Sequence, residues 1–265
     1  MVEPDEFFRA PPPGREAYVL AQAISFDPQQ WISRLPNDEW WPRRLADLPR
    51  VGRWPIVDRR SVFRMAEHTD TPEGRRDLLM AALVWGTGTR AREVARRARV
   101  FHANDPDRLD ERIRSAKAEI DGGDPVAAYR VLNDRHARVK HLGPAFFSKY
   151  LYFATADRPA GERRPLIIDS NVALALNELS DQEWRANERW DSTKYASYLE
   201  LAHAWAERWG TEPDVVERKL FDRGKQLKTS APQTPWSACS RPGPSTAAAG
   251  RHTPGTPCPS FPLQP

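Results

Sequence analysis

One stretch of the sequence, residues 140–176, constrains the fold more than any other part of the chain. It reads KHLGPAFFSKYLYFATADRPAGERRPLIIDSNVALAL. This pattern predicts a turn, an apolar helix, a charged loop, a short β-like run and a second helix. Lys149 falls in the first turns of the first helix, and Asp169 falls at the start of the second. The stretch therefore predicts an amine and a carboxylate near two helix N-termini, twenty positions apart along the chain.

The predicted position of Lys149 favours a reactive amine. The positive end of the helix dipole disfavours the ammonium form of a lysine near a helix start. Apolar neighbours such as Phe146, Phe147 and Tyr150 should remove water from Lys149 and lower its pKa further. A lysine with a lowered pKa can act as a nucleophile or form a Schiff base.

Asp169 presents the opposite case, because a helix N-terminus stabilises a carboxylate in its anionic form. Such an anion can steady a sugar that develops oxocarbenium character as it loses its base. The alternative is structural, since Asp is a common N-cap and a lysine on an amphipathic helix is usually solvated. Spacing alone favours this structural alternative.

The same stretch resembles the helix-hairpin-helix DNA glycosylases, specifically the 8-oxoguanine glycosylase branch. In that family a hairpin delivers a catalytic Lys at the head of a helix, and an Asp opens the next helix after a Pro-apolar-Asp run. Lys149 and Asp169 match these positions, and RPLIID at 164–169 matches the run. The resemblance spans roughly residues 78–224 in helix order, and its specific part is 143–176. It implies catalytic roles for Lys149 and Asp169.

The hairpin departs from the usual Gly-x-Gly pattern of the family. This chain has GPAFFS at 143–148, which is more similar to archaeal-type members with an altered hairpin. Pro144 has no N–H to donate to a phosphate. The predicted DNA contacts are the hairpin itself and the basic group before it, namely Arg135, Arg138, Lys140, His141 and Gly143.

A break in the chain at 86–89 (GTGT) suggests where a base pocket lies. The break lacks the lysine and the preceding strand of a phosphate-binding P-loop. In glycosylases of the type it resembles, loops at comparable points approach the DNA or the extruded base. Trp85, Thr87 and Phe147 are therefore the candidate pocket residues.

Charge alone is poor evidence for DNA binding in this chain. The formal charge is +4, but the last forty residues hold Lys228, Arg241, Arg251 and no acid, so the rest balances 37 basic against 36 acidic residues. Evidence for DNA binding must therefore come from local clusters of basic residues. Five arginines occur within residues 90–99, and two explanations are equally supported: a phosphate-binding group or a solvated helix face.

Several classes of function find no support in the sequence. Cys239 and Cys258 both fall in the last forty residues, and the histidines show no HExxH spacing, so neither a disulfide framework nor a metal site is predicted. We expect no cofactor. The longest apolar run, 78–85, is too short to span a bilayer, and the acidic N-terminus is unlike a signal peptide. We expect a cytoplasmic, nucleoid-associated monomer without a membrane partner.

The predicted fold is mostly α, a helix-hairpin-helix glycosylase-like bundle with a disordered C-terminal tail. The predicted parts are an N-terminal helical segment (1–70), the glycosylase core (71–225) and a Pro-rich tail (226–265), which we interpret as frame-shifted or vector-derived read-through. Four tryptophans, Trp31, Trp40, Trp41 and Trp54, are predicted to be core residues rather than a stacking platform. The expected helices cover 15–23, 28–35, 37–48, 58–68, 71–85, 90–100, 107–121, 125–138, 170–177, 192–209 and 212–223. A further helix is expected after Pro144 and a short one in 181–187, with 50–55 as a loop and 165–168 as the β-like run.

The sequence therefore predicts a DNA glycosylase that extrudes a damaged or modified base from double-stranded DNA. The resemblance favours 8-oxoguanine and base-excision repair. Short bacterial relatives also resemble antiphage glycosylases that remove hypermodified bases such as glucosylated hydroxymethylcytosine. Whether β-elimination at the abasic site follows stays open. The alternative is a non-catalytic helix-hairpin-helix DNA-binding module, which needs the hairpin and the arginines but neither Lys149 nor Asp169.

Overall fold

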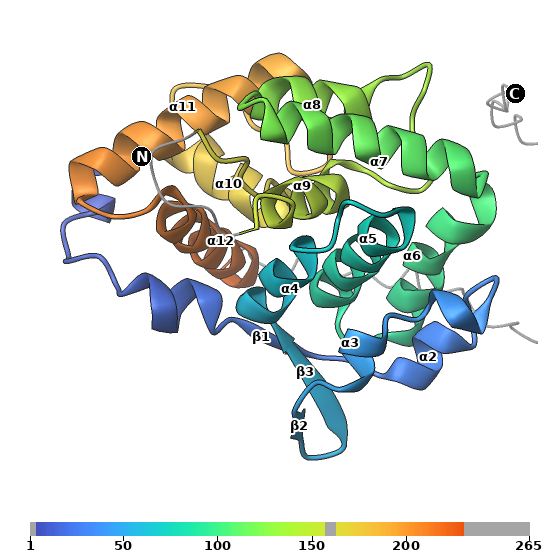
Figure 1. Ribbon diagram of the computed structural model, residues 1–265. Coiled ribbons are helices and arrows are strands. Elements are labelled where there is room, and N and C mark those ends of the chain that lie inside the picture. Colours follow the sequence, from blue (N-terminus) through green and yellow to red (C-terminus); the bar gives the residue numbers. More distant parts are fainter. Residues whose placement is uncertain (1–3, 157–162, 231–265) are drawn as a thin grey trace, which may run out of the picture. The chain divides into compact units, whose positions relative to one another are not determined.

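Helices make up most of the backbone in the computed structural model, which describes residues 4–156 and 163–230 (Figure 1). The helical elements are α1 (Pro4–Phe7), the π-helix η1 (Glu16–Leu20), α2 (Pro28–Ile32), the 3₁₀ helix η2 (Asp38–Trp40), α3 (Arg43–Ala46), α4 (Arg59–Ala66), α5 (Pro72–Thr87), α6 (Ala91–Ala103), α7 (Pro106–Asp121), α8 (Pro125–Asn133), α9 (Pro144–Phe153), α10 (Ser170–Leu179), α11 (Ser192–Trp209) and α12 (Pro213–Ser230). The mostly helical fold predicted from the sequence is confirmed.

Helix starts follow the capping residues in the sequence. The side chains of Asp27, Asp105, Asp124 and Asp191 each accept a backbone N–H in the first turn of the helix that follows. Such caps satisfy N–H groups that have no partner within the helix. This is why helix starts were predictable, and α11 has the predicted bounds, Ser192–Trp209.

Helix ends were less predictable. α5 continues through Gly86 and Thr87 and ends only at Gly88, whose φ is 73°. α8 ends at Asn133 rather than at 138, because the carboxylate of Asp134 accepts the N–H of His136 and turns the chain. The predicted short helix in 181–187 does not form.

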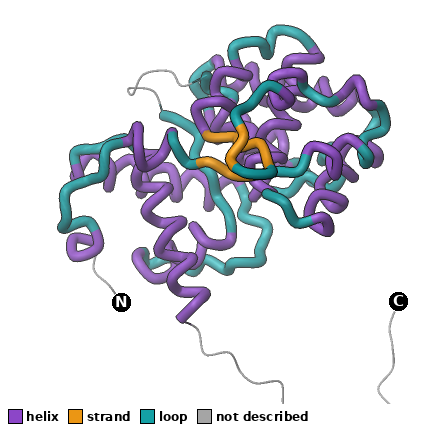
Figure 2. The backbone as a smooth tube through the Cα atoms, turned by 90° about the horizontal axis from the view of Figure 1, so that it is seen from below, coloured by secondary structure: helices purple, strands orange, loops and turns teal. Residues whose placement is uncertain are grey.

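A small antiparallel sheet interrupts the helices, in the order β1-β3-β2 (Figure 2). Its strands are β1 (Ala23–Ser25), β2 (Arg50–Val51) and β3 (Trp54–Asp58). The predicted loop at 50–55 was therefore wrong, and so was the run 165–168 as the β-like segment, since no strand forms there. Strands of two to five residues are too short for the alternation that identifies a strand in a sequence.

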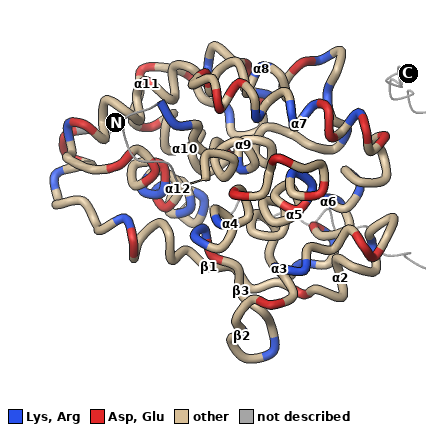
Figure 3. Tube along the Cα trace, in the orientation of Figure 1, with Lys and Arg blue, Asp and Glu red and all other residues tan. Residues whose placement is uncertain are grey.

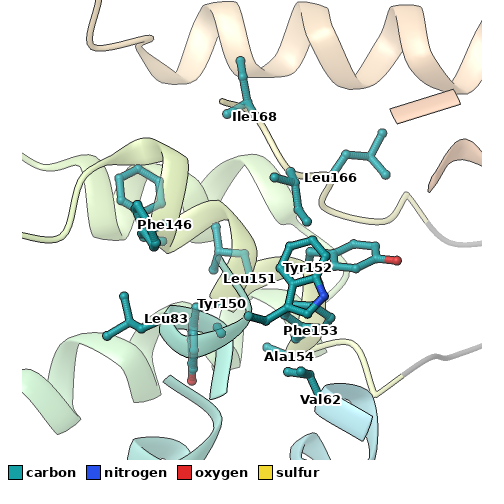
Figure 4. Packing of buried hydrophobic residues seen from close by; sticks show 14 of the residues in the cluster. Val62, Leu83, Phe146, Tyr150, Leu151, Tyr152, Phe153, Ala154, Leu166 and Ile168 are labelled. Atoms are coloured by element: carbon teal, nitrogen blue, oxygen red, sulfur yellow. The ribbon is translucent and has the colours of Figure 1, made fainter. Parts of the chain in front are cut away.

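Helix α9 lies at the centre of the helical part (Figure 1) and packs against α4, α5, α7 and α8. Every residue from Phe146 to Ala154 is buried. Figure 4 shows the side chains of Phe146 and of residues 150–154 among those of Leu83, Val62 and Leu166. A helix that is apolar on all sides can be stable only when it is surrounded by protein. Lys149 is thus carried on the most enclosed helix of the described fold.

The N-terminal residues pack directly against the C-terminal helices. Arg59 forms a fully buried ion pair with Glu217 at 2.7 Å, and Arg15 pairs with Asp214 at 2.8 Å. The division predicted at residue 70 stays a prediction, and these contacts cross it. Of the four tryptophans predicted to be core, Trp31 is fully buried, whereas Trp40, Trp41 and Trp54 are half-buried.

Helix α12 continues to Ser230, so residues 226–230 are helical rather than part of a disordered tail. The Lys228 amine donates to the Ser170 hydroxyl at 2.7 Å, next to Asp169. The rest of the predicted tail, 231–265, lies outside the described residues. In the view of Figure 3, basic and acidic positions are interspersed along the helices, in keeping with the near balance of charge outside the last forty residues.

The close approach of α12 to α10 depends on Gly224. A Cβ at this position would lie 1.9 Å from the carbonyl oxygen of Asn171. Helix propensity alone would make Gly224→Ala stabilising by about 1 kcal/mol. We expect instead a loss of about 1–3 kcal/mol in the free energy of unfolding, because the helices must separate. Urea denaturation measures this, with exposed Gln226→Ala as the control, and a Gly224→Ala protein as stable as wild type would contradict the packing.

Candidate active site

Lys149 and Asp169 meet in the fold. The Nζ of Lys149 lies 3.8 Å from Oδ2 of Asp169, although the two residues belong to different helices. Lys149 is in the second turn of α9, and Asp169 is the N-cap of α10. The amine and the carboxylate to which the resemblance assigns catalytic roles are therefore neighbours in the structure, and the roles themselves stay a prediction.

The two oxygens of Asp169 have different partners. Oδ1 accepts the backbone N–H groups of Asn171 at 2.8 Å and Val172 at 3.2 Å. These bonds hold the carboxylate in one orientation at the positive end of α10. Oδ2 remains directed at the lysine. A single side chain thus caps the helix and provides a negative charge for chemistry.

Burial sets the state of Lys149. Its side chain is 8% exposed, and this burial lowers the pKa of the amine, while the nearby carboxylates of Asp169 and Glu217 act in the opposite direction. Nζ also donates to the carbonyl of Ala145 at 2.6 Å and lies 5.2 Å from the ring centroid of Phe146. The amine is therefore held in place and more easily deprotonated than that of a solvated lysine.

The close passage of the Lys149 stem requires Gly86 on α5. A Cβ at Gly86 would lie 2.9 Å from Cδ of Lys149 and 2.9 Å from Cε1 of Phe146. Any larger residue would therefore push the lysine or the phenylalanine aside. The sequence predicted that the helix breaks at this glycine. Its role is to leave room for the lysine inside a helix that continues.

One hydroxyl group links the residue that precedes Lys149 to the residue that precedes Asp169. Oγ of Ser148 accepts the N–H of Ile168 at 3.2 Å and donates to the carbonyl of the same residue at 3.3 Å. Ser148 directly precedes Lys149, and Ile168 directly precedes Asp169. The hydroxyl therefore ties the two halves of the pair together through their neighbours.

Two tyrosines of α11 complete the support of the run before Asp169. The Tyr195 hydroxyl bonds both the N–H and the carbonyl of Leu166, at 3.0 and 2.9 Å, and the Tyr198 hydroxyl donates to Ile167 at 3.0 Å. These hydroxyl groups satisfy the buried backbone N–H and carbonyl groups, as hydrogen bonds to a neighbouring strand would do in a sheet. The roles of Ser148, Tyr195 and Tyr198 were not predicted from the sequence. For Ser148, a serine in an otherwise apolar helix was a usable signal.

A cavity of about 630 Å³ opens onto the lysine and the aspartate. Its walls come from the end of α5, the first half of α6, the starts of α9 and α10, and residues 186–190. The volume lies within the roughly 300–1,000 Å³ of ligand pockets. Its lining holds charges of both signs, since Arg96 and Arg97 are cationic and Glu93 and Glu188 are anionic. A nucleoside-sized ligand can thus reach the amine and the carboxylate together.

The predicted DNA contacts lie on the loop of residues 134–143 that joins α8 to α9. The side chains of Arg135, Arg138, Lys140 and His141 are exposed there. Two bonds hold the loop, since the Asn104 side chain accepts from the N–H of Lys140 at 2.8 Å and donates to its carbonyl at 3.0 Å. His141 has a φ of 64°, which marks a tight turn.

Gly143 is exposed, caps α9 and lines the cavity. The altered hairpin therefore reaches from the exposed basic residues of the loop to the cavity itself. Its contacts with DNA stay a prediction.

Of the three predicted pocket residues, Thr87 lines the cavity, and Trp85 and Phe147 are core residues. The indole N–H of Trp85 donates to the carbonyl of Gln22 at 3.1 Å. Phe147 packs edge-on against Tyr129 at 4.8 Å. The aromatic residues that line the cavity are Phe146, which precedes Phe147, and Trp190, so the geometry gives no support to pocket roles for Trp85 and Phe147.

Two further properties concern only the described part of the chain. Within residues 4–156 and 163–230, no helix has both the length and the apolar character needed to cross a membrane. No group of three or more His, Cys, Asp or Glu side chains in these ranges is arranged to hold a metal ion.

A mostly helical bundle that brings a buried lysine beside an N-cap aspartate agrees with the resemblance to the helix-hairpin-helix DNA glycosylases. The family described as "Putative 8-oxoguanine DNA glycosylase OGG-like protein" matches residues 17–221. The chain belongs to this OGG-like family, which supports a DNA glycosylase-like function on a DNA substrate. No curated protein and no solved structure gives a significant match.

The tie between Ser148 and Ile168 predicts a measurable loss of stability. Ser148→Ala would leave the buried N–H and carbonyl of Ile168 without a partner. We expect the free energy of unfolding to fall by about 1–3 kcal/mol, measured by urea denaturation. Ser115→Ala is the matched control, because its hydroxyl bonds a helix carbonyl at the surface, and equal stability of the two variants would contradict the tie.

Proposed function

We propose that this protein is a DNA glycosylase that removes a damaged or modified base from double-stranded DNA through a Schiff base on Lys149. The base leaves the stack first, because inside a duplex its glycosidic bond is out of reach. The cavity beside Lys149 and Asp169 receives the extruded nucleotide. The exposed loop of residues 134–143 holds the backbone phosphates on either side, which positions the protein without reading sequence.

The chemistry follows from the two side chains. The neutral amine of Lys149 attacks C1′, and a C–N bond forms as the bond from C1′ to the base breaks. The base departs with the electron pair and takes up a proton. The sugar ring then opens, O4′ leaves C1′ with its electron pair and is protonated, and the nitrogen becomes an imine. Water hydrolyses this Schiff base, or loss of the C2′ proton leads to β-elimination of the 3′ phosphate.

Asp169 assists at two points in this scheme. Positive charge develops on the sugar as the base leaves, and a fixed carboxylate next to it lowers the energy of that state. The same carboxylate stands beside the amine and can take its proton. Since one oxygen is held by two backbone N–H groups, the charge is oriented before the substrate arrives.

One observation supports the proposal above all others, the 3.8 Å separation of Nζ and Oδ2 at the mouth of a cavity. A module that only binds DNA has no use for a buried amine beside a carboxylate, which is costly to desolvate. The non-catalytic alternative therefore leaves this arrangement unexplained. It also gives no reason for Gly86, which makes room for the lysine.

The family name favours an 8-oxoguanine-type lesion as the substrate. A hypermodified base of phage DNA, such as glucosylated hydroxymethylcytosine, is the second candidate, and both would use the same Lys149 and Asp169. The two roles are distinguished by the base that is released. Mass spectrometry of bases freed from oxidised DNA and from modified phage DNA identifies it directly.

Borohydride trapping tests the mechanism. Wild-type protein should form a covalent adduct with a duplex that carries the substrate base, and Lys149→Ala should form none. Asp169→Asn should fold normally, because Asn is also a good N-cap, and should form adduct more slowly by about a hundredfold or more.

Circular dichroism checks that the Lys149→Ala and Asp169→Asn proteins remain folded. DNA binding by wild type with neither an adduct nor an abasic product on any candidate base would replace the glycosylase by the binding module. An adduct that persists in Lys149→Ala would assign the Schiff base to another amine.

The lowered pKa of Lys149 predicts the pH dependence of the adduct. On a duplex with a preformed abasic site, attack of the neutral amine on C1′ begins the trapping reaction, and excess cyanoborohydride then reduces the protonated imine. The rate of trapping should rise with pH and level off below the ordinary pKa of lysine, because burial lowers the pKa of Lys149.

The Asp169→Asn variant tests the direction in which the midpoint of this pH profile moves. The Asp169 carboxylate raises the pKa of Lys149, so Asp169→Asn should move the midpoint to lower pH. A profile that levels off only at the ordinary lysine pKa, or a midpoint that moves to higher pH in Asp169→Asn, would contradict the described environment.

A further inference from the structure

The wall of the cavity next to Lys149 contains a stacked pair that the mechanism above does not use. The guanidinium carbon of Arg97 lies 3.8 Å from the ring centroid of Phe146. Arg97 comes from α6 and Phe146 from the first turn of α9. At this distance the cation is in contact with the face of the ring, which holds it there.

Arg97 is held in place but only partly paired. Its side chain is 16% exposed, and its one ion pair among the described residues is a long contact of 3.3 Å with Glu93. The Nε atom is buried and has no hydrogen-bond partner in the described part of the chain.

Phe146 fixes the pair relative to the reacting groups. Its ring is wedged at Gly86, where an added Cβ would lie 2.9 Å from it, and the Nζ of Lys149 lies 5.2 Å from its centroid. Arg97, Phe146, Lys149 and Asp169 all line the same cavity. A sugar placed at the amine therefore has its base within the space that Arg97 borders.

We propose that the guanidinium of Arg97, held on Phe146, is the surface on which the extruded nucleobase stacks while Lys149 and Asp169 act on its sugar. This inference rests on the proposed glycosylase function. The ligand is a planar nucleobase, and every base offers a π-face to a guanidinium. The stack therefore contributes affinity for an extruded base of any identity, and the polar groups of the cavity select among bases.

A phosphate contact is the competing role for an arginine at this site. Arg96, the neighbouring residue on α6, lines the same cavity and is exposed, as phosphate-binding side chains usually are. Arg97 is the more buried of the two and has an aromatic ring against its guanidinium. The two arginines thus form a matched pair, one suited to the base and one to the backbone.

Two duplexes of the same sequence separate these roles. One carries 8-oxoguanine at the target position, replaced by whichever base gives the adduct in the trapping experiment, and the other carries a tetrahydrofuran abasic analogue that has no base. Affinities are measured by fluorescence anisotropy in a Lys149→Gln background at one salt concentration. In that background, Arg97→Ala should weaken binding to the base-carrying duplex by about five- to a hundredfold and leave the tetrahydrofuran duplex unchanged.

Two control variants sharpen the result. Arg97→Lys keeps the charge and loses the planar group, so it should resemble Arg97→Ala on the base-carrying duplex. Arg96→Ala removes a charge from the cavity rim and should weaken binding to both duplexes equally. Thermal unfolding of each variant checks that the fold is retained.

Several results would overturn the stacking role. Equal losses on both duplexes with Arg97→Ala would make Arg97 a phosphate contact, and no loss on either would leave it structural. Full affinity in Arg97→Lys would show that charge alone suffices. The proposed function is judged separately, since adduct formation by wild type does not depend on these affinities.

Discussion

The structure depends on the burial of an ionisable amine on a helix that is enclosed on every side. Helix α9 is apolar except for Ser148, Lys149 and the hydroxyl groups of two tyrosines. The side chains of Ser148 and Lys149 face the segment that leads into α10. A buried lysine without a partner is costly, so the surrounding fold must supply a carboxylate at the right place. The fold does so by making the helix cap of α10 the partner of the amine.

The support for this arrangement comes from segments far apart in the sequence. The run before Asp169 is held by hydroxyl groups of Ser148, Tyr195 and Tyr198 rather than by a strand. The buried ion pair of Arg59 and Glu217 joins the N-terminal part of the chain to α12. Burial opposes the charge of Arg59, but Glu217 outweighs this effect and raises the pKa of Arg59. Buried hydroxyl groups and a buried ion pair therefore hold the segments that carry the site.

Local signals made part of this predictable from the sequence. N-caps such as Asp169 and the periodicity of α11 depend on adjacent residues, so helix starts followed from the sequence. The pairing of Lys149 with Asp169 is a tertiary contact, and only the family resemblance pointed to it. The β-hairpin was missed because pairing of such short strands is set by tertiary contacts. The choice of Phe146 over Phe147 for the cavity depends on the rotation of α9, which apolar residues on all sides do not determine.

The length of α12 has a consequence for how this protein is produced and compared with others. Its last turn carries Lys228, which bonds Ser170 beside the cap of α10, and Gly224 rests on the backbone of Asn171. A gene product shortened at the compositional break near residue 225 would lose the bond from Lys228 to Ser170, while it would keep Gly224 and every residue of the cavity. Such a protein would carry Lys149 and Asp169 on a loosened scaffold, so a weak result in the trapping experiment would reflect the shortened helix rather than the absence of the proposed chemistry.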